Sequence, residues 1–213
     1  MTKYVILSKK NWVEFIATMV ADWIKRNIVI DDLEYLKIKL GIEVILINLL
    51  KGTVIYGLAF VLNTFYLTLI LHTSYLFLRV KSHGLHAKTS LNCSTISIVL
   101  FVLLPYFSRH FIFSNHFIII SFMVSFLCLN RYAPADTEKQ PLINRQRREK
   151  LRKQSLIHCL ILFFITLMIK NPDIKKMITL GILSQIIFTL PLTYKILKRS
   201  YNNYEKYTET FDE

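Results

Sequence analysis

A histidine and a cysteine, His86 and Cys93, stand seven residues apart in a short basic stretch of the chain. Cysteine chemistry needs a thiolate, which a neighbouring base or nearby positive charge favours. His83 and His86 are the local bases. Arg79, Lys81 and Lys88 supply local positive charge. The residue types therefore indicate either a cysteine nucleophile with a histidine as its general base, or a cysteine and a histidine with structural roles.

The seven-residue step restricts how the pair can meet. On a straight helix, residues 86 and 93 would lie about 10.5 Å apart along the axis, whereas proton transfer needs about 3 Å. The backbone must therefore fold back, for which Gly84 provides a flexible point. Otherwise the pair would form between two subunits, so a homodimer is a second possibility. No acidic residue lies between Glu43 and Asp136, and a dyad assisted by the amide of Asn92 fits better than a triad with a carboxylate.

The composition places this basic stretch in a membrane protein. The 213 residues are 53% hydrophobic and carry a net charge of +13. A soluble domain this apolar would need a larger interior than its length allows. Apolar segments in lipid, joined by basic loops, account for both properties. We predict an all-α polytopic integral membrane protein.

The apolar segments should number about six. They are preceded by an amphipathic helix over residues 12–24, which either lies in the headgroup region or packs against the protein's own helices. The predicted membrane segments are residues 35–50, 54–78, 95–107, 111–129, 156–169 and 177–194, with a break at Lys51 and Gly52. The first is the weakest, because Lys37, Lys39 and Glu43 would enter the membrane. It either spans, lies partly in the interface or re-enters.

Six crossings with both termini in the cytoplasm place 22 of the 27 Lys and Arg residues inside, as membrane proteins prefer. The Lys and Arg residues left outside are Lys51, Arg109, Lys170, Lys175 and Lys176. We expect a single domain over residues 1–213, made of an interfacial segment (1–34), a cytoplasmic catalytic loop (79–93), a basic cytoplasmic loop (131–154) and a C-terminal tail (195–213).

The basic loop ends in a dense run of charge that begins at Arg145. It either anchors the chain to anionic lipid or docks an acidic peptide. Nucleic acid is not an expected partner, because aromatic residues are not interleaved with these charges. No cofactor or metal motif occurs, so we expect neither. The three cysteines have no paired spacing, and Cys128 and Cys159 are expected to be packing residues.

In several motifs the chain resembles the staphylococcal accessory gene regulator B proteins, membrane peptidases that process an autoinducing-peptide precursor in quorum sensing. The resemblance runs through residues 39–43 (Lys-Leu-Gly-Ile-Glu), Arg79, residues 83–87 (His-Gly-Leu-His-Ala), Cys93, residues 132–135 (Tyr-Ala-Pro-Ala) and Gln140-Pro141. It implies that His86 and Cys93 are the catalytic pair. Arg79 and Gly84 fall on motif positions. Together with His83 and Asn92, they are expected to support the catalytic pair.

The resemblance also implies a reaction and a partner. Cys93 would cleave the C-terminal part of the precursor through a thioester, and an internal cysteine of the peptide would then close a thiolactone ring. The precursor is expected to lie at the bacterial cell membrane and to have an acidic tail. Candidate docking residues for it are Glu43, Lys139, Arg145, Arg147, Arg148, Lys150, Arg152 and Lys153. Family members often carry Gln at position 43 and more lysines after position 135, so the preferred precursor is expected to differ.

Two other functions remain as alternatives. A peptide or ion transporter would need ionisable residues within its spans, for which His72 and Arg109 are the candidates. A non-catalytic membrane sensor or scaffold would tolerate loss of both His86 and Cys93.

Overall fold

The computed structural model describes residues 12–85, 90–138 and 140–208. Over these residues the chain is helical and forms no β-strand, with two isolated β-bridges in its loops. The chain divides into two compact units, residues 1–57 and residues 58–213. The predicted all-α fold is confirmed.

The first unit contains α1 (Trp12–Asn27) and most of α2 (Asp32–Val61). A capping box starts α2, because Asp31 Oδ1 accepts from the Glu34 N–H at 2.6 Å and Glu34 Oε2 accepts from the Asp31 N–H at 3.3 Å. The α1 helix buries Ala17 and Ala21 and exposes an apolar face formed by Trp12, Phe15, Met19 and Trp23. The predicted amphipathic helix over residues 12–24 is therefore present and extends to Asn27.

Charges predicted to burden the first membrane segment are partly neutralised within this unit. Lys39 Nζ lies 3.4 Å from Glu14 Oε1, which joins the two helices. The Tyr35 hydroxyl donates to Asp22 Oδ1 at 2.7 Å. The polar side of α1 thus pairs with the beginning of α2, whereas the exposed apolar side of α1 stays free of these contacts.

The predicted break at Lys51 and Gly52 is wrong. Both residues lie inside α2, which continues to Val61. A glycine inside a helix lowers stability by only about 1 kcal/mol relative to alanine, so it need not end one. The chain turns instead at residues 62–64, where Asn63 has a φ of 53°. The predicted span over residues 54–78 is consequently divided between two helices.

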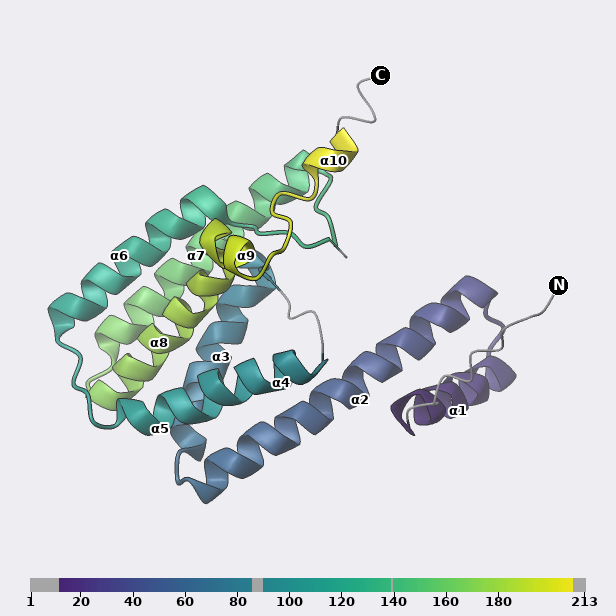
Figure 1. The fold of residues 1–213 in the computed structure, drawn as a ribbon, viewed down its shortest axis with the longest axis horizontal. Helices are drawn as coiled ribbons and strands as arrows, with labels where there is room; N and C mark the ends of the chain where they lie inside the picture. Colours follow the sequence, from purple (N-terminus) through teal and green to yellow (C-terminus); the bar gives the residue numbers. More distant parts are fainter. Residues whose placement is uncertain (1–11, 86–89, 139, 209–213) are drawn as a thin grey trace. The chain divides into compact units, whose positions relative to one another are not determined.

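In the second unit, α8 (Pro172–Thr189) lies against three other helices: α3 (Phe65–Ser82), α6 (Asn115–Tyr132) and α7 (Arg145–Met168). Figure 1 shows α6, α7 and α8 running side by side. Gly181 permits the close packing of α8 on α3, because a Cβ there would lie 2.6 Å from the Leu71 carbonyl oxygen. The shared core includes Leu78, Phe122 and Ile182.

The remaining helices extend this bundle. The segment from α4 (Ser90–Ile98) continues through a π-helical turn (Val99–Leu103) into α5 (Leu104–Ser108). After α8 come two short helices, α9 (Pro191–Ile196) and α10 (Glu205–Thr208). Two predicted loops are thus partly helical: α4 begins inside residues 79–93, and α7 begins inside residues 131–154.

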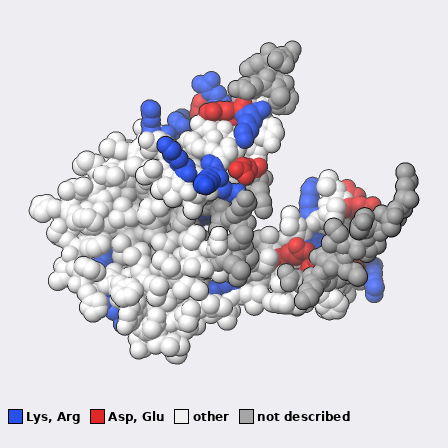
Figure 2. All heavy atoms as spheres, in the orientation of Figure 1, with Lys and Arg blue, Asp and Glu red and all other residues white. Residues whose placement is uncertain are grey.

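Among the described helices, α2 and α7 are long and apolar enough to cross a membrane. At about 1.5 Å per residue they are about 45 and 36 Å long, more than the roughly 30 Å of bilayer hydrocarbon. Figure 2 shows Lys and Arg gathered over the end of the second unit where α7 begins, while most of that face is uncharged. This distribution is typical of a membrane-associated protein.

Candidate active site

The chain that follows α3 is held on both sides by backbone hydrogen bonds. The Leu85 N–H donates to the Phe188 carbonyl at the end of α8, at 2.9 Å. The Ser82 carbonyl accepts from the Ala135 N–H in the loop after α6, at 3.0 Å. Residues 82–85 therefore lie between two distant parts of the sequence, immediately before the predicted base His86.

Gly84 is required by this path. Its φ is +132°, which side chains with a Cβ rarely adopt. A Cβ at this position would also lie 2.9 Å from the Phe188 carbonyl oxygen and 3.2 Å from Arg79 Nη1. The sequence predicts a flexible point at Gly84. The structure shows a backbone conformation that favours glycine there, and the return of the chain toward Cys93 stays a prediction.

The Arg79 side chain turns back from α3 to bind the same segment. Its Nη2 donates to the Leu85 carbonyl at 2.9 Å and to the Gly84 carbonyl at 3.3 Å. Its guanidinium lies over the rings of Tyr75 and Phe188, 5.5 and 5.7 Å from their centroids. Arg79 therefore acts on the backbone before His86.

Gln185 completes this network from α8 and was not anticipated from the sequence. Its side chain is fully buried. Its Oε1 accepts from Arg79 Nη1 at 3.1 Å, and its Nε2 donates to Ser82 Oγ at 2.7 Å and to the His83 carbonyl. One amide thus joins the end of α3, the extended segment and the arginine that holds it.

Cys93 lies in the first turns of α4, not in a loop as predicted, and its side chain is half-buried. Asn92 precedes it on the same helix and is exposed. The predicted base, His86, lies outside the described residues, so its pairing with Cys93 stays a prediction.

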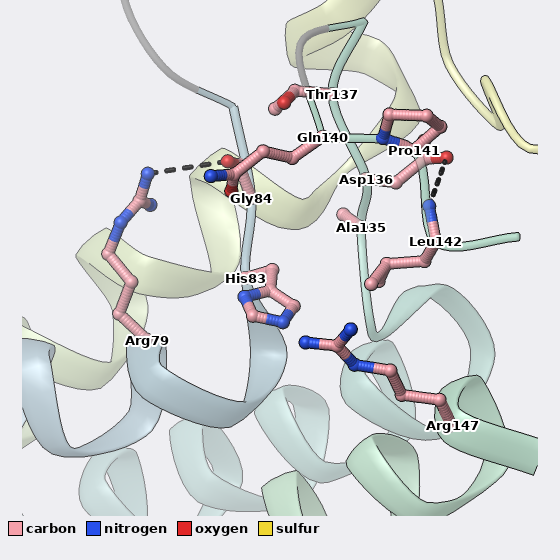
Figure 3. Close-up of a pocket in the computed structure, with 10 residues that line it drawn as sticks. All are labelled: Arg79, His83, Gly84, Ala135, Asp136, Thr137, Gln140, Pro141, Leu142 and Arg147. Carbon is pink, nitrogen blue, oxygen red and sulfur yellow. Dashed lines mark hydrogen bonds between the residues drawn. The ribbon is translucent and has the colours of Figure 1, made fainter. Parts of the chain in front are cut away.

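His83 ends α3 and faces a cavity of about 400 Å³ (Figure 3). The residues around it come from α3, from the loop after α6 and from the start of α7. Six of them are Arg79, His83, Thr137, Gln140, Leu142 and Arg147. Figure 3 shows the His83 ring and the Arg147 guanidinium pointing toward one another.

Burial and neighbouring cations make His83 hard to protonate. Burial is the largest cause, followed by Arg147, Arg79 and Lys81, and together they lower the pKa of His83 from its usual 6.5. Within the described part of the chain, its buried Nε2 has no hydrogen-bond partner. Buried polar atoms without a partner are uncommon in folded proteins.

Asp136, the first acidic residue after Glu43, has a structural role. Its Oδ1 accepts from the Asn203 N–H and its Oδ2 from the Tyr204 N–H, each at 2.9 Å, and Oδ2 also accepts from the Leu142 N–H at 3.5 Å. The carboxylate therefore joins the loop after α6 to the C-terminal segment. Burial and the neighbouring phenols and carboxylate raise the pKa of Tyr201, in the same segment, to about 12.

The basic residues predicted to dock substrate separate into different environments. Arg148 Nη1 donates to the Leu142 and Ile143 carbonyls, each at 2.7 Å, and Arg152 Nε donates to the Ala133 carbonyl at 2.9 Å. The cavity is lined by Arg147 alone among these predicted docking residues that the structure describes. Arg145 pairs with Glu149, and Lys150 and Lys153 are exposed. Glu43 lies on α2. Lys139 lies outside the described residues.

Two residues of this site carried only weak signals in the sequence. Gln185 is a single amide within a long apolar run, and Tyr75 is an aromatic residue within another. Their partners are set by packing between helices distant in sequence. Across residues 12–85, 90–138 and 140–208, no three His, Cys, Asp or Glu side chains are grouped to hold a metal ion.

Comparison with known proteins places these residues in a family. The family model described as Accessory gene regulator B matches residues 17–189. An AgrB-like protein of Listeria innocua is 45% identical over 177 residues, which cover 83% of this chain and 87% of the relative. An AgrB-like protein of Clostridium acetobutylicum is 37% identical over 202 residues, which cover 95% of this chain and 97% of the relative. Accessory gene regulator protein B of Staphylococcus lugdunensis is 37% identical over 174 residues, covering 82% and 92%. No solved structure matches the chain.

Proposed function

Because the chain belongs to the accessory gene regulator B family, we propose that it is a membrane cysteine endopeptidase that cleaves an autoinducing-peptide precursor and closes a thiolactone ring. The observation that carries the proposal is the anchoring of residues 82–85 by Arg79, Gln185 and Phe188. A catalytic base must be held within a fraction of an ångström of its working position. The network fixes the chain directly before His86.

In the proposed first step, the Cys93 sulfur attacks a peptide carbonyl of the precursor as His86 takes the thiol proton. The tetrahedral intermediate collapses, the C–N bond breaks, and His86 returns the proton to the leaving amine. The C-terminal fragment departs with a free amino group. The remaining peptide is held on Cys93 as a thioester.

In the second step, the thiol of an internal cysteine of the peptide attacks this thioester. The new S–C bond closes the ring, and Cys93 leaves as a thiolate that regains a proton. One thioester replaces another, so the exchange is nearly neutral in energy, whereas hydrolysis would discard the activated bond. Holding the internal thiol near Cys93 supplies the high effective concentration that ring closure needs.

We also propose that the chain crosses the bacterial cell membrane several times, with the His86–Cys93 segment, the start of α7 and both termini in the cytoplasm. The support is the positive charge gathered at the start of α7 (Figure 2) and the preference of basic loops for the cytoplasmic side. On this orientation, the precursor would reach Cys93 from the cytoplasmic face of the bilayer.

The test is precursor processing in membranes that contain the full-length protein. A tagged precursor is co-expressed, its C-terminal fragment is detected by immunoblot, and the thiolactone is detected by mass spectrometry. Cys93→Ala should abolish both products while inserting normally. Cys128→Ala and Cys159→Ala are matched controls that remove thiols from α6 and α7, and both should retain most activity. Normal cleavage by Cys93→Ala would reject the peptidase.

The same assay separates the two histidines. His86→Ala should block formation of the acyl-enzyme, because no base would take the thiol proton. His83→Ala should mainly lower the rate, because His83 lies at the end of α3 beside the cavity. A reversed pair of phenotypes would move the general base to His83.

A further inference from the structure

We propose that the cavity between His83 and Arg147 binds a single carboxylate group of the peptide substrate. This inference rests on the proposed peptidase function and adds a defined recognition site to it. It also differs from a general attraction of acidic peptides to the basic start of α7. The cavity volume, about 400 Å³, falls within the range of small-ligand pockets, roughly 300–1,000 Å³.

Two hydrogen-bonding groups of the cavity wall have no partner among the residues that the structure describes. The buried His83 Nε2 has none among the described residues. Within residues 12–85, 90–138 and 140–208, the hydrogen bond found for Arg147 comes from its backbone N–H, to Asn144 Oδ1, and not from its guanidinium. The exposed Arg147 lines the cavity, and its guanidinium faces His83 (Figure 3). A carboxylate between them would accept from both, and it would offset the repulsion that Arg147 exerts on protonated His83.

The charges around the cavity favour an anion. Arg79 and Arg147 contribute two positive charges and Asp136 one negative charge. Both carboxylate oxygens of Asp136 already accept backbone N–H groups, so Asp136 is not available to bind Arg147. The Arg79 N–H groups are likewise engaged with Leu85 and Gln185. Arg79 therefore provides charge, while Arg147 provides both charge and available donors.

The location of the cavity suits a group carried by the substrate. His83 and Gly84 form one wall, and the same segment leads directly to His86. A carboxylate held here would lie beside the chain that positions the proposed base. Anchoring an acidic residue of the peptide at this point would set which peptide bond reaches Cys93.

A peptide fits the cavity better than a lipid headgroup. Arg147 is in the first turn of α7, and the apolar part of that helix begins at Leu156. Nine residues of helix span about 13 Å, so the mouth of the cavity stands away from the apolar zone. Thr137 and Gln140 add polar groups to its wall. We therefore assign the occupant to the aqueous side.

The test uses full-length protein with Cys93→Ala, in nanodiscs of phosphatidylcholine, so that binding is measured without turnover. The probe is a dye-labelled peptide with three glutamates, and its counterpart has three glutamines. Fluorescence anisotropy should show the glutamate peptide binding about tenfold more tightly, as expected for charge-assisted hydrogen bonds. Adding Arg147→Ala should remove most of this preference, and Arg147→Lys should restore part of it.

Arg145→Ala is the matched control. It removes the same charge two residues earlier from an exposed side chain that pairs with Glu149, and it should leave the preference within about twofold. Equal losses in Arg145→Ala and Arg147→Ala would overturn the cavity site in favour of a diffuse basic surface. Equal binding of both peptides to the protein that retains Arg147 would also overturn it.

One further arm separates peptide from lipid. Nanodiscs containing phosphatidylglycerol should weaken glutamate-peptide binding equally in the protein that retains Arg147 and in the Arg147→Ala variant, because the bilayer repels the peptide in both. A loss confined to the protein that retains Arg147 would show that a lipid phosphate occupies the cavity and would reject the carboxylate assignment. The binding test uses Cys93→Ala protein and measures no cleavage. A negative binding result would therefore reject the carboxylate site without bearing on the cleavage test of Cys93.

Discussion

Replacing Gln185 by methionine keeps a long unbranched side chain in the core but removes the amide that joins α8 to the segment before His86. Gln185 is fully buried and binds Arg79, Ser82 and the His83 carbonyl. Methionine can fill the space, since it adapts to irregular packing. The variant therefore tests hydrogen bonding at this position with little loss of volume.

The expected effect is large for a single polar group. Each buried donor or acceptor left without a partner destabilises by about 1–3 kcal/mol. Gln185→Met removes the bonds to two such groups, Arg79 Nη1 and the His83 carbonyl, whereas Ser82 Oγ still donates to the Leu78 carbonyl. These contributions are not additive within one network, so we expect about 3 kcal/mol for the ordered arrangement of residues 82–85. If that ordering is needed to hold His86, acyl-enzyme formation should slow by about a hundredfold.

The assay is single-turnover acyl-enzyme formation by full-length protein in nanodiscs, with thermal unfolding measured on the same samples. Gln185→Glu provides a second test, because its carboxylate can still accept from Arg79 but places an oxygen against the His83 carbonyl. It should also be slow. Ser184→Ala, a buried position on the same helix, is the control and should react at close to the normal rate.

A structural role alone would lower stability and leave the rate constant of correctly folded enzyme unchanged. We expect instead that kcat falls, because the network holds the segment that carries the proposed base. KM should rise as well, because His83 and Gly84 of the same segment line the cavity. Gln185→Met forming acyl-enzyme at the normal rate below its unfolding temperature would refute the positioning argument.

Three other predictions follow from the same geometry. Gly84→Ala should abolish activity and lower the unfolding temperature, since its Cβ would contact the Phe188 carbonyl at 2.9 Å; near-normal cleavage would contradict the backbone assignment. The pKa of His83 is lowered in the folded state, so the unfolded state binds more protons at low pH, and stability should fall as pH drops through about 6.5; denaturation of His83→Gln from pH 7.5 to 5.5 should show a weaker fall, and an identical one would refute it. A single cysteine at exposed Gln146, in a background without other exposed thiols, should resist an impermeant thiol reagent in intact cells and react after permeabilisation; labelling in intact cells would reverse the orientation.

The helical fold and the amphipathic helix at residues 12–24 could be predicted from the sequence, because apolar periodicity and the flanking charges report them directly. The break at Lys51 and Gly52 could not, since a long apolar helix tolerates both residues. The true turn depends on Asn63 adopting a positive φ. Local composition gives little warning of a turn made by one residue.

The neighbouring residues of the candidate site could be singled out from the sequence, whereas its distant residue Gln185 could not. Arg79, Gly84 and Cys93 carried recognisable chemistry within fifteen residues of one another. Gln185 lies about a hundred residues from Ser82 in sequence, and only the packing of α8 on α3 brings them together. The basic residues from Arg145 onward look equivalent in the sequence, but the structure gives them different partners. Arg148 and Arg152 bind backbone carbonyls, which the sequence does not indicate.

The most direct test of the central claim is mass spectrometry of the enzyme–peptide intermediate. Full-length protein is mixed with precursor, quenched in acid within the first turnover and digested. The account predicts a thioester on Cys93 that carries the precursor without its C-terminal fragment, is released by hydroxylamine and is absent in His86→Ala. Cleaved precursor with no adduct on Cys93, or with the adduct on Cys128 or Cys159, would contradict it.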